Sequence, residues 1–214
     1  MNLAALVASA SLLASQGGTI NTQTIHEHQK SAAYANHSYG NEDLAGILKM
    51  AEASAATRPN YAIALYRRVM AENGPLAEKA VEGAMQIYNK RLPFKEYNKW
   101  EVQNALSFFD EIAQKHPKYA AEAYLKSGEI LCDFLFWIPE RIPESMLRLD
   151  MAYKLGDNST KAKARFKQGV MQDLIDNKEK AIRYFREVTK LAPKSEEAQF
   201  ARNFLETLSI KHFR

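Results

Sequence analysis

The sequence lacks most of the residue patterns from which common catalytic and metal sites are built. It has a single cysteine, Cys132, which excludes an intramolecular disulfide and any zinc site that depends on cysteine ligands. A Gly-rich phosphate loop, a Gly-x-Ser-x-Gly sequence and a His-Glu-x-x-His sequence are all missing. We therefore predict a protein that is not an enzyme, with no metal, no cofactor and no small-molecule substrate.

Long apolar runs are missing as well. No stretch of about 18 consecutive apolar residues occurs, so the sequence predicts no transmembrane span. The overall composition is that of a folded protein, with 46% hydrophobic and 25% charged residues among 214. Such a chain can bury a sizeable core.

Positive charge is concentrated toward the C-terminal end. From Lys161 onward the sequence has 13 Lys and Arg against 7 Asp and Glu. Such a region suits an acidic partner, a membrane surface or nucleic acid. The simpler interpretation is a solvated helix surface, because alternating charges such as Lys161, Lys163, Arg165 and Lys167 are spread around a helix. We expect no nucleic-acid partner, and peripheral membrane association stays open.

The first 40 residues divide into an apolar and a polar segment. Residues 1–16 resemble the apolar core of a secretory signal, although the first Lys or Arg is Lys30. An amphipathic docking helix and a transit peptide are the alternatives for this segment. Residues 17–40 are polar and are predicted to form a linker. An exported, for example periplasmic, protein is our first expectation, and a cytoplasmic one is the alternative.

Helical periodicity begins near residue 41 and continues to the C-terminal end. Apolar residues recur at helical spacing in paired segments separated by Gly, Pro and Asn. We predict four helical hairpins at 43–74, 76–117, 119–157 and 160–193, and a single helix at 195–212. Asn41 and Ser195 are predicted to cap the first and the last helix. The expected fold class is all-α.

The fourth hairpin carries the most specific pattern. Gly169 is followed at offsets of 12, 16, 19 and 24 by Ala181, Phe185, Val188 and Pro193. This spacing resembles the tetratricopeptide (TPR) repeat, a helix–turn–helix unit of about 34 residues. The second hairpin repeats the last four positions as Ala105, Phe109, Ile112 and Pro117. The resemblance implies a right-handed α-solenoid of about four hairpins, closed by a capping helix at 195–212.

TPR proteins bind partners on a concave surface formed by the first helix of each hairpin. If the resemblance holds, this surface carries a mixture of apolar and charged residues, namely Tyr88, Glu129, Asp133, Lys163, Phe166 and Val170. This hypothesis requires Phe166 and Val170 to be accessible rather than buried between repeats.

A second candidate contact region is the aromatic segment 134–142. It contains Phe136 and Trp137 and is interrupted by Pro139. Either the segment packs between neighbouring repeats, or it is an exposed patch on which Phe136 and Trp137 anchor a partner.

The segments AEAYLKSGEI and LAPKSEEAQFAR are similar to sequences in TPR proteins of bacterial cell envelopes. The resemblance implies a non-catalytic protein–protein adaptor that binds a peptide or helix of a partner during envelope assembly. The alternatives are a structural subunit of a larger complex and a helical-repeat nucleic-acid binder that uses the basic C-terminal end.

Overall fold

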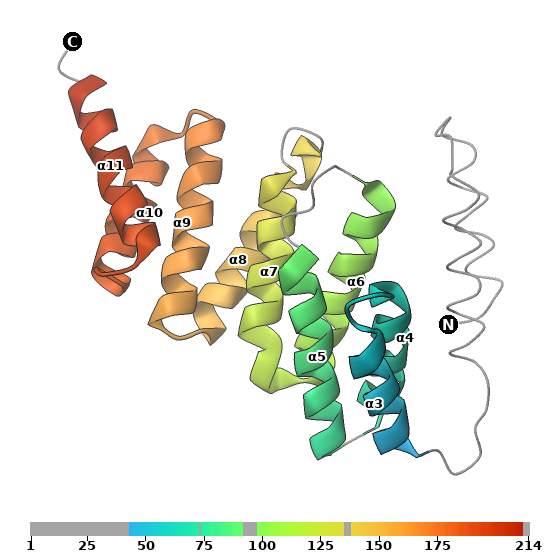
Figure 1. The fold of residues 1–214 in the computed structure, drawn as a ribbon. Coiled ribbons are helices and arrows are strands. Elements are labelled where there is room, and N and C mark those ends of the chain that lie inside the picture. Colours follow the sequence, from blue (N-terminus) through green and yellow to red (C-terminus); the bar gives the residue numbers. More distant parts are fainter. Residues whose placement is uncertain (1–42, 73, 92–97, 135–137, 212–214) are drawn as a thin grey trace, which may run out of the picture. The chain divides into compact units, whose positions relative to one another are not determined.

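The computed structural model describes residues 43–72, 74–91, 98–134 and 138–211. The predictions made for residues 1–42, and those for Phe136 and Trp137, lie outside these ranges. Within them the secondary structure is entirely helical, without a strand, which confirms the all-α prediction (Figure 1). None of the described helices is long and apolar enough to cross a membrane. The chain divides into two compact units, 1–89 and 90–214, which are described separately.

The N-terminal unit contains three described helices, α3 (Leu44–Ser54), α4 (Pro59–Met70) and α5 (Pro75–Arg91). Helices α3 and α4 contact each other as the first predicted hairpin requires. Gly83 allows α5 to approach α4 closely, because a β-carbon there would lie 2.5 Å from the Tyr66 ring. The core of this unit consists of small and aliphatic side chains with Tyr66 and Tyr88 among them.

One prediction about a helix start in this unit was wrong. Helix α3 begins at Leu44 with Asp43, not Asn41, at the N-cap position, and aspartate is as favourable there as asparagine. Pro59 begins α4. Proline fits the first turn of a helix because the backbone N–H it lacks would have no partner within the helix.

The C-terminal unit contains six described α-helices and two short 3-10 helices. In chain order these are α6 (Lys99–Lys115), η1 (Pro117–Tyr119), α7 (Ala120–Asp133), η2 (Pro139–Arg141), α8 (Ile142–Leu155), α9 (Asn158–Leu174), α10 (Lys178–Leu191) and α11 (Glu196–Lys211). Each α-helix contacts the next one in the chain, and α9 also contacts both α7 and α11 (Figure 1). The helices α7, α9 and α11 are therefore neighbours. The predicted second hairpin, 76–117, spans the division between the two units.

The α7–α8 and α9–α10 hairpins share the same close contact at a glycine. A β-carbon at Gly128 would lie 2.7 Å from Leu149 Cδ2, and one at Gly169 would lie 2.7 Å from Phe185 Cε1. Both large side chains are fully buried. Six residues of the second helices of these hairpins are fully buried, namely Ser145, Leu149, Ala152, Ala181, Phe185 and Val188. Small residues in the first helix thus allow the second helix to pack closely, as expected for ridge-and-groove packing.

Capping residues fix the starts of the last three helices. The backbone N–H of Thr160 donates to Asp157 Oδ1 at 2.8 Å, and that of Lys180 donates to Asn177 Oδ1 at 3.4 Å. The predicted cap at Ser195 is confirmed, because Ala198 N–H donates to its hydroxyl at 3.1 Å. These bonds satisfy backbone donors that have no partner within the helix.

The segment that joins α7 to α8 is partly buried. Phe134 and Ile138 are 6% and 7% exposed, so these two residues of the aromatic segment pack into the core. Pro139 begins η2, and Pro143 lies in the first turn of α8. The predicted interruption is therefore seen at Pro139, which lies between α7 and α8, whereas Pro143 lies inside α8.

Candidate functional site

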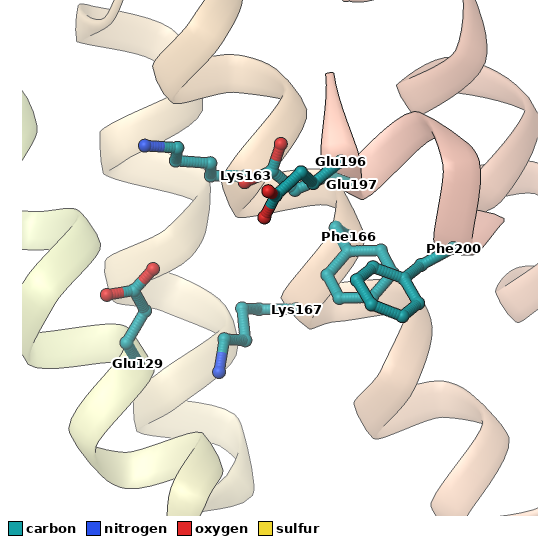
Figure 2. A pocket seen from close by; sticks show the side chains of 7 residues that line it. All are labelled: Glu129, Lys163, Phe166, Lys167, Glu196, Glu197 and Phe200. Carbon is teal, nitrogen blue, oxygen red and sulfur yellow. The ribbon is translucent and has the colours of Figure 1, made fainter. Parts of the chain in front are cut away.

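A hollow of about 140 Å³ opens between α7, α9 and α11 in the C-terminal unit. We call it the α7–α9–α11 groove. One residue of α7, three of α9 and three of α11 line it (Figure 2), namely Glu129, Lys163, Phe166, Lys167, Glu196, Glu197 and Phe200.

The helical repeat places these side chains on common faces. Lys163, Phe166 and Lys167 are spaced i, i+3 and i+4 along α9, so they project from one side of it. Glu196, Glu197 and Phe200 lie in the first turns of α11, whose start is fixed by the Ser195 cap. The groove is therefore held by regular helices and not by a loop.

Aromatic rings connect the groove to the core. The Phe166 ring lies 5.9 Å from that of Phe185 and 6.2 Å from that of Phe200, measured between centroids. Phe185 in turn stacks on Phe204 at 4.9 Å. Phe185 is fully buried, whereas Phe200 is 56% exposed. This series of contacts connects the exposed Phe200 ring, through the half-buried Phe166 ring, to the buried Phe185 ring.

Two charged residues of the groove are already paired. Lys167 Nζ lies 2.8 Å from Asp133 Oδ1, and Lys126 Nζ lies 3.0 Å from Glu129 Oε2. Burial by itself would lower the pKa of Lys167, but the attraction and hydrogen bond of Asp133 outweigh it and raise the pKa above its usual value. Lys167 therefore stays charged and tied to α7.

Three further charges are available to a partner. Lys163, Glu196 and Glu197 take part in none of the ion pairs found in the described parts of the chain. Glu196 and Glu197 lie beside Phe166, whereas the amine of Lys163 points away from the two rings (Figure 2). An apolar centre with unpaired charges of both signs around it can bind an apolar side chain that has charged neighbours.

No family model, curated protein or solved structure matches this chain. The groove is therefore interpreted from its own residues and their geometry.

The groove brings together three of the residues predicted for the binding surface, Glu129, Lys163 and Phe166. Asp133 joins them indirectly through its ion pair with Lys167. Phe166 is half-buried against its two aromatic neighbours but still lines the groove, so it remains a candidate residue of the partner-binding surface.

The other predicted residues lie elsewhere. Val170 is half-buried against the α10–α11 core and does not line the groove. Tyr88 is only 6% exposed and belongs to the core of the N-terminal unit, so its side chain offers little surface to a partner. Phe136 and Trp137 are outside the described residues.

Four lining residues were not predicted from the sequence, namely Lys167, Glu196, Glu197 and Phe200. Lys167 was detectable, because it lies one helical turn after Lys163. Phe200 was detectable as an aromatic residue that does not share the helix face of Ala198 and Ala201. No signal in the sequence indicated that Glu196 and Glu197 line a site, beyond the usual preference of acidic residues for a helix N-terminus.

The described residues offer little reactive chemistry at or near this groove. No group of three or more His, Cys, Asp or Glu in the described ranges is placed to hold a metal ion. Cys132 of α7 is buried, and burial raises its pKa to about 11. Its thiol is therefore neutral near pH 7, and a neutral thiol is a poor nucleophile.

Proposed function

We propose that this chain is a non-catalytic adaptor that binds a peptide or helix of a partner protein in the α7–α9–α11 groove. The observation that carries the proposal is the exposed Phe200 ring, which lies against the half-buried Phe166 in a groove also lined by Lys163, Glu196 and Glu197. An apolar anchor of the partner would contact the rings, and its charged residues would set the register.

The size of the groove supports a peptide over a small molecule. Small-molecule pockets typically enclose about 300–1,000 Å³, whereas this hollow measures about 140 Å³. It has room for one or two side chains. A longer partner would lie across α7, α9 and α11 and insert only its anchor residue.

We also propose that the hairpins form a TPR-like α-solenoid of about four units, with α11 as the capping helix. The shared glycine contact of the α7–α8 and α9–α10 hairpins supports equivalent units. The contacts of α9 with α7 and α11 support stacking of successive first helices. In such arrays each unit contacts mainly its neighbours, and a terminal helix covers the last exposed face.

The proposal can be tested with a photoreactive amino acid in place of Phe200 in the full-length protein, expressed in its own cells. We expect irradiation to crosslink a specific partner protein. The matched control carries the same amino acid in place of Arg186, which is exposed on α10. We expect Lys163→Glu, introduced in addition, to reduce the crosslink at position 200, because it reverses a charge that lines the same groove.

Two results would overturn the adaptor proposal. One is the absence of a crosslinked protein at position 200. The other is the same set of products at positions 200 and 186, which would show that the contacts are not specific to the groove.

We further propose an exported, for example periplasmic, location, supported by the apolar composition of residues 1–16. Mass spectrometry of the mature N-terminus tests it: a start downstream of Ala10 or Ser15 supports export. An intact Met1, together with cytoplasmic partners, contradicts it.

A further inference from the structure

The ion pairs of the α7–α9–α11 groove leave an excess of negative charge on its α11 side. Two of the charged lining residues, Glu129 and Lys167, already have a partner of opposite charge within the chain. The charged lining residues that remain are Lys163, Glu196 and Glu197, and no ion pair among the described residues includes them. The positive end of the α11 dipole amounts to about half a charge, so it offsets the two glutamates only in part.

The two glutamates share a helix surface with the exposed ring. Phe200 follows Glu196 by four residues and Glu197 by three, so the three side chains lie on one side of α11. The Phe200 ring is 56% exposed, and its centroid lies 6.2 Å from that of Phe166. Both glutamates lie beside Phe166, whereas the amine of Lys163 points away from the rings (Figure 2). The groove thus presents two carboxylates next to an accessible aromatic ring.

A carboxylate and the face of an aromatic ring attract the same kind of ligand. The face of a ring is electron-rich and binds a cation that lies within about 6 Å of its centroid. A guanidinium group is planar, so it can stack on a ring while its N–H groups donate to carboxylates. An ammonium group is compact and does not stack in this way, and an acidic side chain would be repelled by both glutamates. The groove therefore fits an arginine side chain best.

The C-terminal unit contains one complete example of this arrangement, at Arg165 of α9. Its guanidinium lies 3.7 Å from the centroid of the Tyr153 ring. The same group pairs with Asp150 of α8 at 3.1 Å and with Glu187 of α10 at 2.8 Å. One ring and two carboxylates are thus enough to hold an arginine in this chain.

The described part of the chain supplies no such cation to the groove. Lys167 is held by Asp133. Arg202, on the same helix as the two glutamates, donates to the backbone carbonyl of Pro193 at 3.1 Å and to Gln199 Oε1 at 3.0 Å. The ring and the carboxylates are therefore available to a cation from another molecule.

We propose that the partner inserts an arginine into the α7–α9–α11 groove, with its guanidinium on the Phe200 ring and its N–H groups directed at Glu196 and Glu197. This inference rests on the proposed adaptor function and adds the chemistry that the partner must carry. The arginine stands next to the apolar anchor of the partner, and its aliphatic stem extends the apolar contact with the rings.

The experiment begins with a selection of short random peptides displayed on phage against the full-length protein. Peptides that bind the wild type but not Phe200→Ala report the groove, and we expect arginine to be enriched among them. Fluorescence anisotropy then gives the dissociation constant of a selected peptide for each variant. Circular dichroism verifies that every variant keeps its helix content.

Removal of the two charges with little change of size gives the decisive measurement. Glu196→Gln with Glu197→Gln should raise the dissociation constant about tenfold, because charge-assisted hydrogen bonds to the arginine are lost. Replacing the arginine of the peptide by glutamine should weaken binding to the wild type by a similar factor, and should change binding to this variant little. The matched control, Glu179→Gln with Glu206→Gln, changes two exposed glutamates outside the groove and should bind like the wild type.

The possible failures separate this inference from the adaptor proposal. Peptides that depend on Phe200 but lack arginine would overturn the inference and leave the adaptor proposal standing. The inference is equally overturned if no selected peptide depends on Phe200, or if the Glu196 and Glu197 variant and its control bind alike. The adaptor proposal is decided independently, by the crosslink at position 200.

Discussion

Gly169 of α9 lies directly against Phe185 of α10, so closely that a β-carbon on the glycine would be 2.7 Å from Cε1 of the ring. The ring is fully buried and contacts Phe166 and Phe204 on its other sides. It therefore has little room to move away from a larger residue at position 169.

We expect Gly169→Ala to lower the free energy of unfolding by about 1–3 kcal/mol, the usual cost of overpacking a core. The cost of overpacking thus opposes the gain in helix stability of about 1 kcal/mol that alanine normally brings when it replaces glycine in a helix interior. Urea denaturation of the full-length protein measures the change in the free energy of unfolding. In a Phe185→Leu background Gly169→Ala should lower the free energy of unfolding by less, because the ring that the alanine would meet is absent. An equal loss in both backgrounds would contradict the close contact between Gly169 and Phe185.

Arg165 forms the centre of a second interaction between helices. Its guanidinium lies 3.7 Å from the centroid of the Tyr153 ring and 5.1 Å from that of Tyr184. It also pairs with Asp150 on α8 at 3.1 Å and with Glu187 on α10 at 2.8 Å. A planar guanidinium can stack on rings and bind two carboxylates at the same time.

We expect Arg165→Lys to lower the free energy of unfolding by about 1–2 kcal/mol, because an ammonium group cannot reproduce the stacked and forked geometry. Chemical denaturation measures the change. Arg186→Lys, at an exposed position of α10, is the control and should be nearly neutral. Equal effects of the two substitutions would show that the Arg165 contacts contribute nothing specific.

Cys132 should react slowly in the folded protein. Burial raises its pKa to about 11 even though the nearby Lys167 charge acts to lower it. At pH 8 the thiolate fraction is then roughly a hundredfold smaller than that of an ordinary cysteine. A chromogenic disulfide reagent should therefore label Cys132 in the native chain at least roughly a hundredfold more slowly than in the chain unfolded in guanidinium. Similar labelling rates for the two states would contradict the burial of the thiol.

Asp157 should make the stability of α9 depend on pH. The backbone N–H of Thr160 donates to its carboxylate at 2.8 Å, and this bond lowers the pKa of Asp157 below its usual value. The folded state therefore favours the charged form. Its contribution to stability is fully present above the unfolded pKa of about 3.9 and is lost as the pH falls through the lower folded value.

We expect Asp157→Ala to lower the free energy of unfolding by about 1 kcal/mol at pH 7. The difference from the wild type should shrink below about pH 4, where the wild-type carboxylate is protonated as well. Thermal unfolding across this pH range measures both effects. Asp157→Asn keeps a capping oxygen and should cost little at pH 7, and a penalty for Asp157→Ala that does not change with pH would contradict the role of the charge.

Much of the helical structure was predictable because its causes are local. The inward positions Ala105, Phe109 and Ile112 follow helical spacing in the sequence, and all three are buried. Helix ends were predictable to within a few residues where the signal was specific, as at Ser195. The start of the first helix was predicted less well, because asparagine and aspartate are equally suited to its N-cap position.

The candidate site was predictable only in part. Glu129 and Phe200 are far apart in the sequence and line one groove because α7, α9 and α11 are neighbours. Tyr88 has the spacing of a surface position in the TPR pattern but is buried in the N-terminal unit. A repeat pattern assigns a residue to a helix face, and the neighbouring helix then decides whether that face is open.

The sequence by itself determined the class of this protein, the approximate helix boundaries, and the small residues at which α9 and α10 approach each other. These features depend on backbone hydrogen bonds, caps and apolar spacing within a few residues of one another. The tertiary structure alone decided that Lys167 pairs with Asp133, and that Phe166 is half-buried while Phe200 is exposed beside it. Ion pairing and exposure depend on which side chains another helix brings within a few ångströms, and spacing along one helix does not specify that.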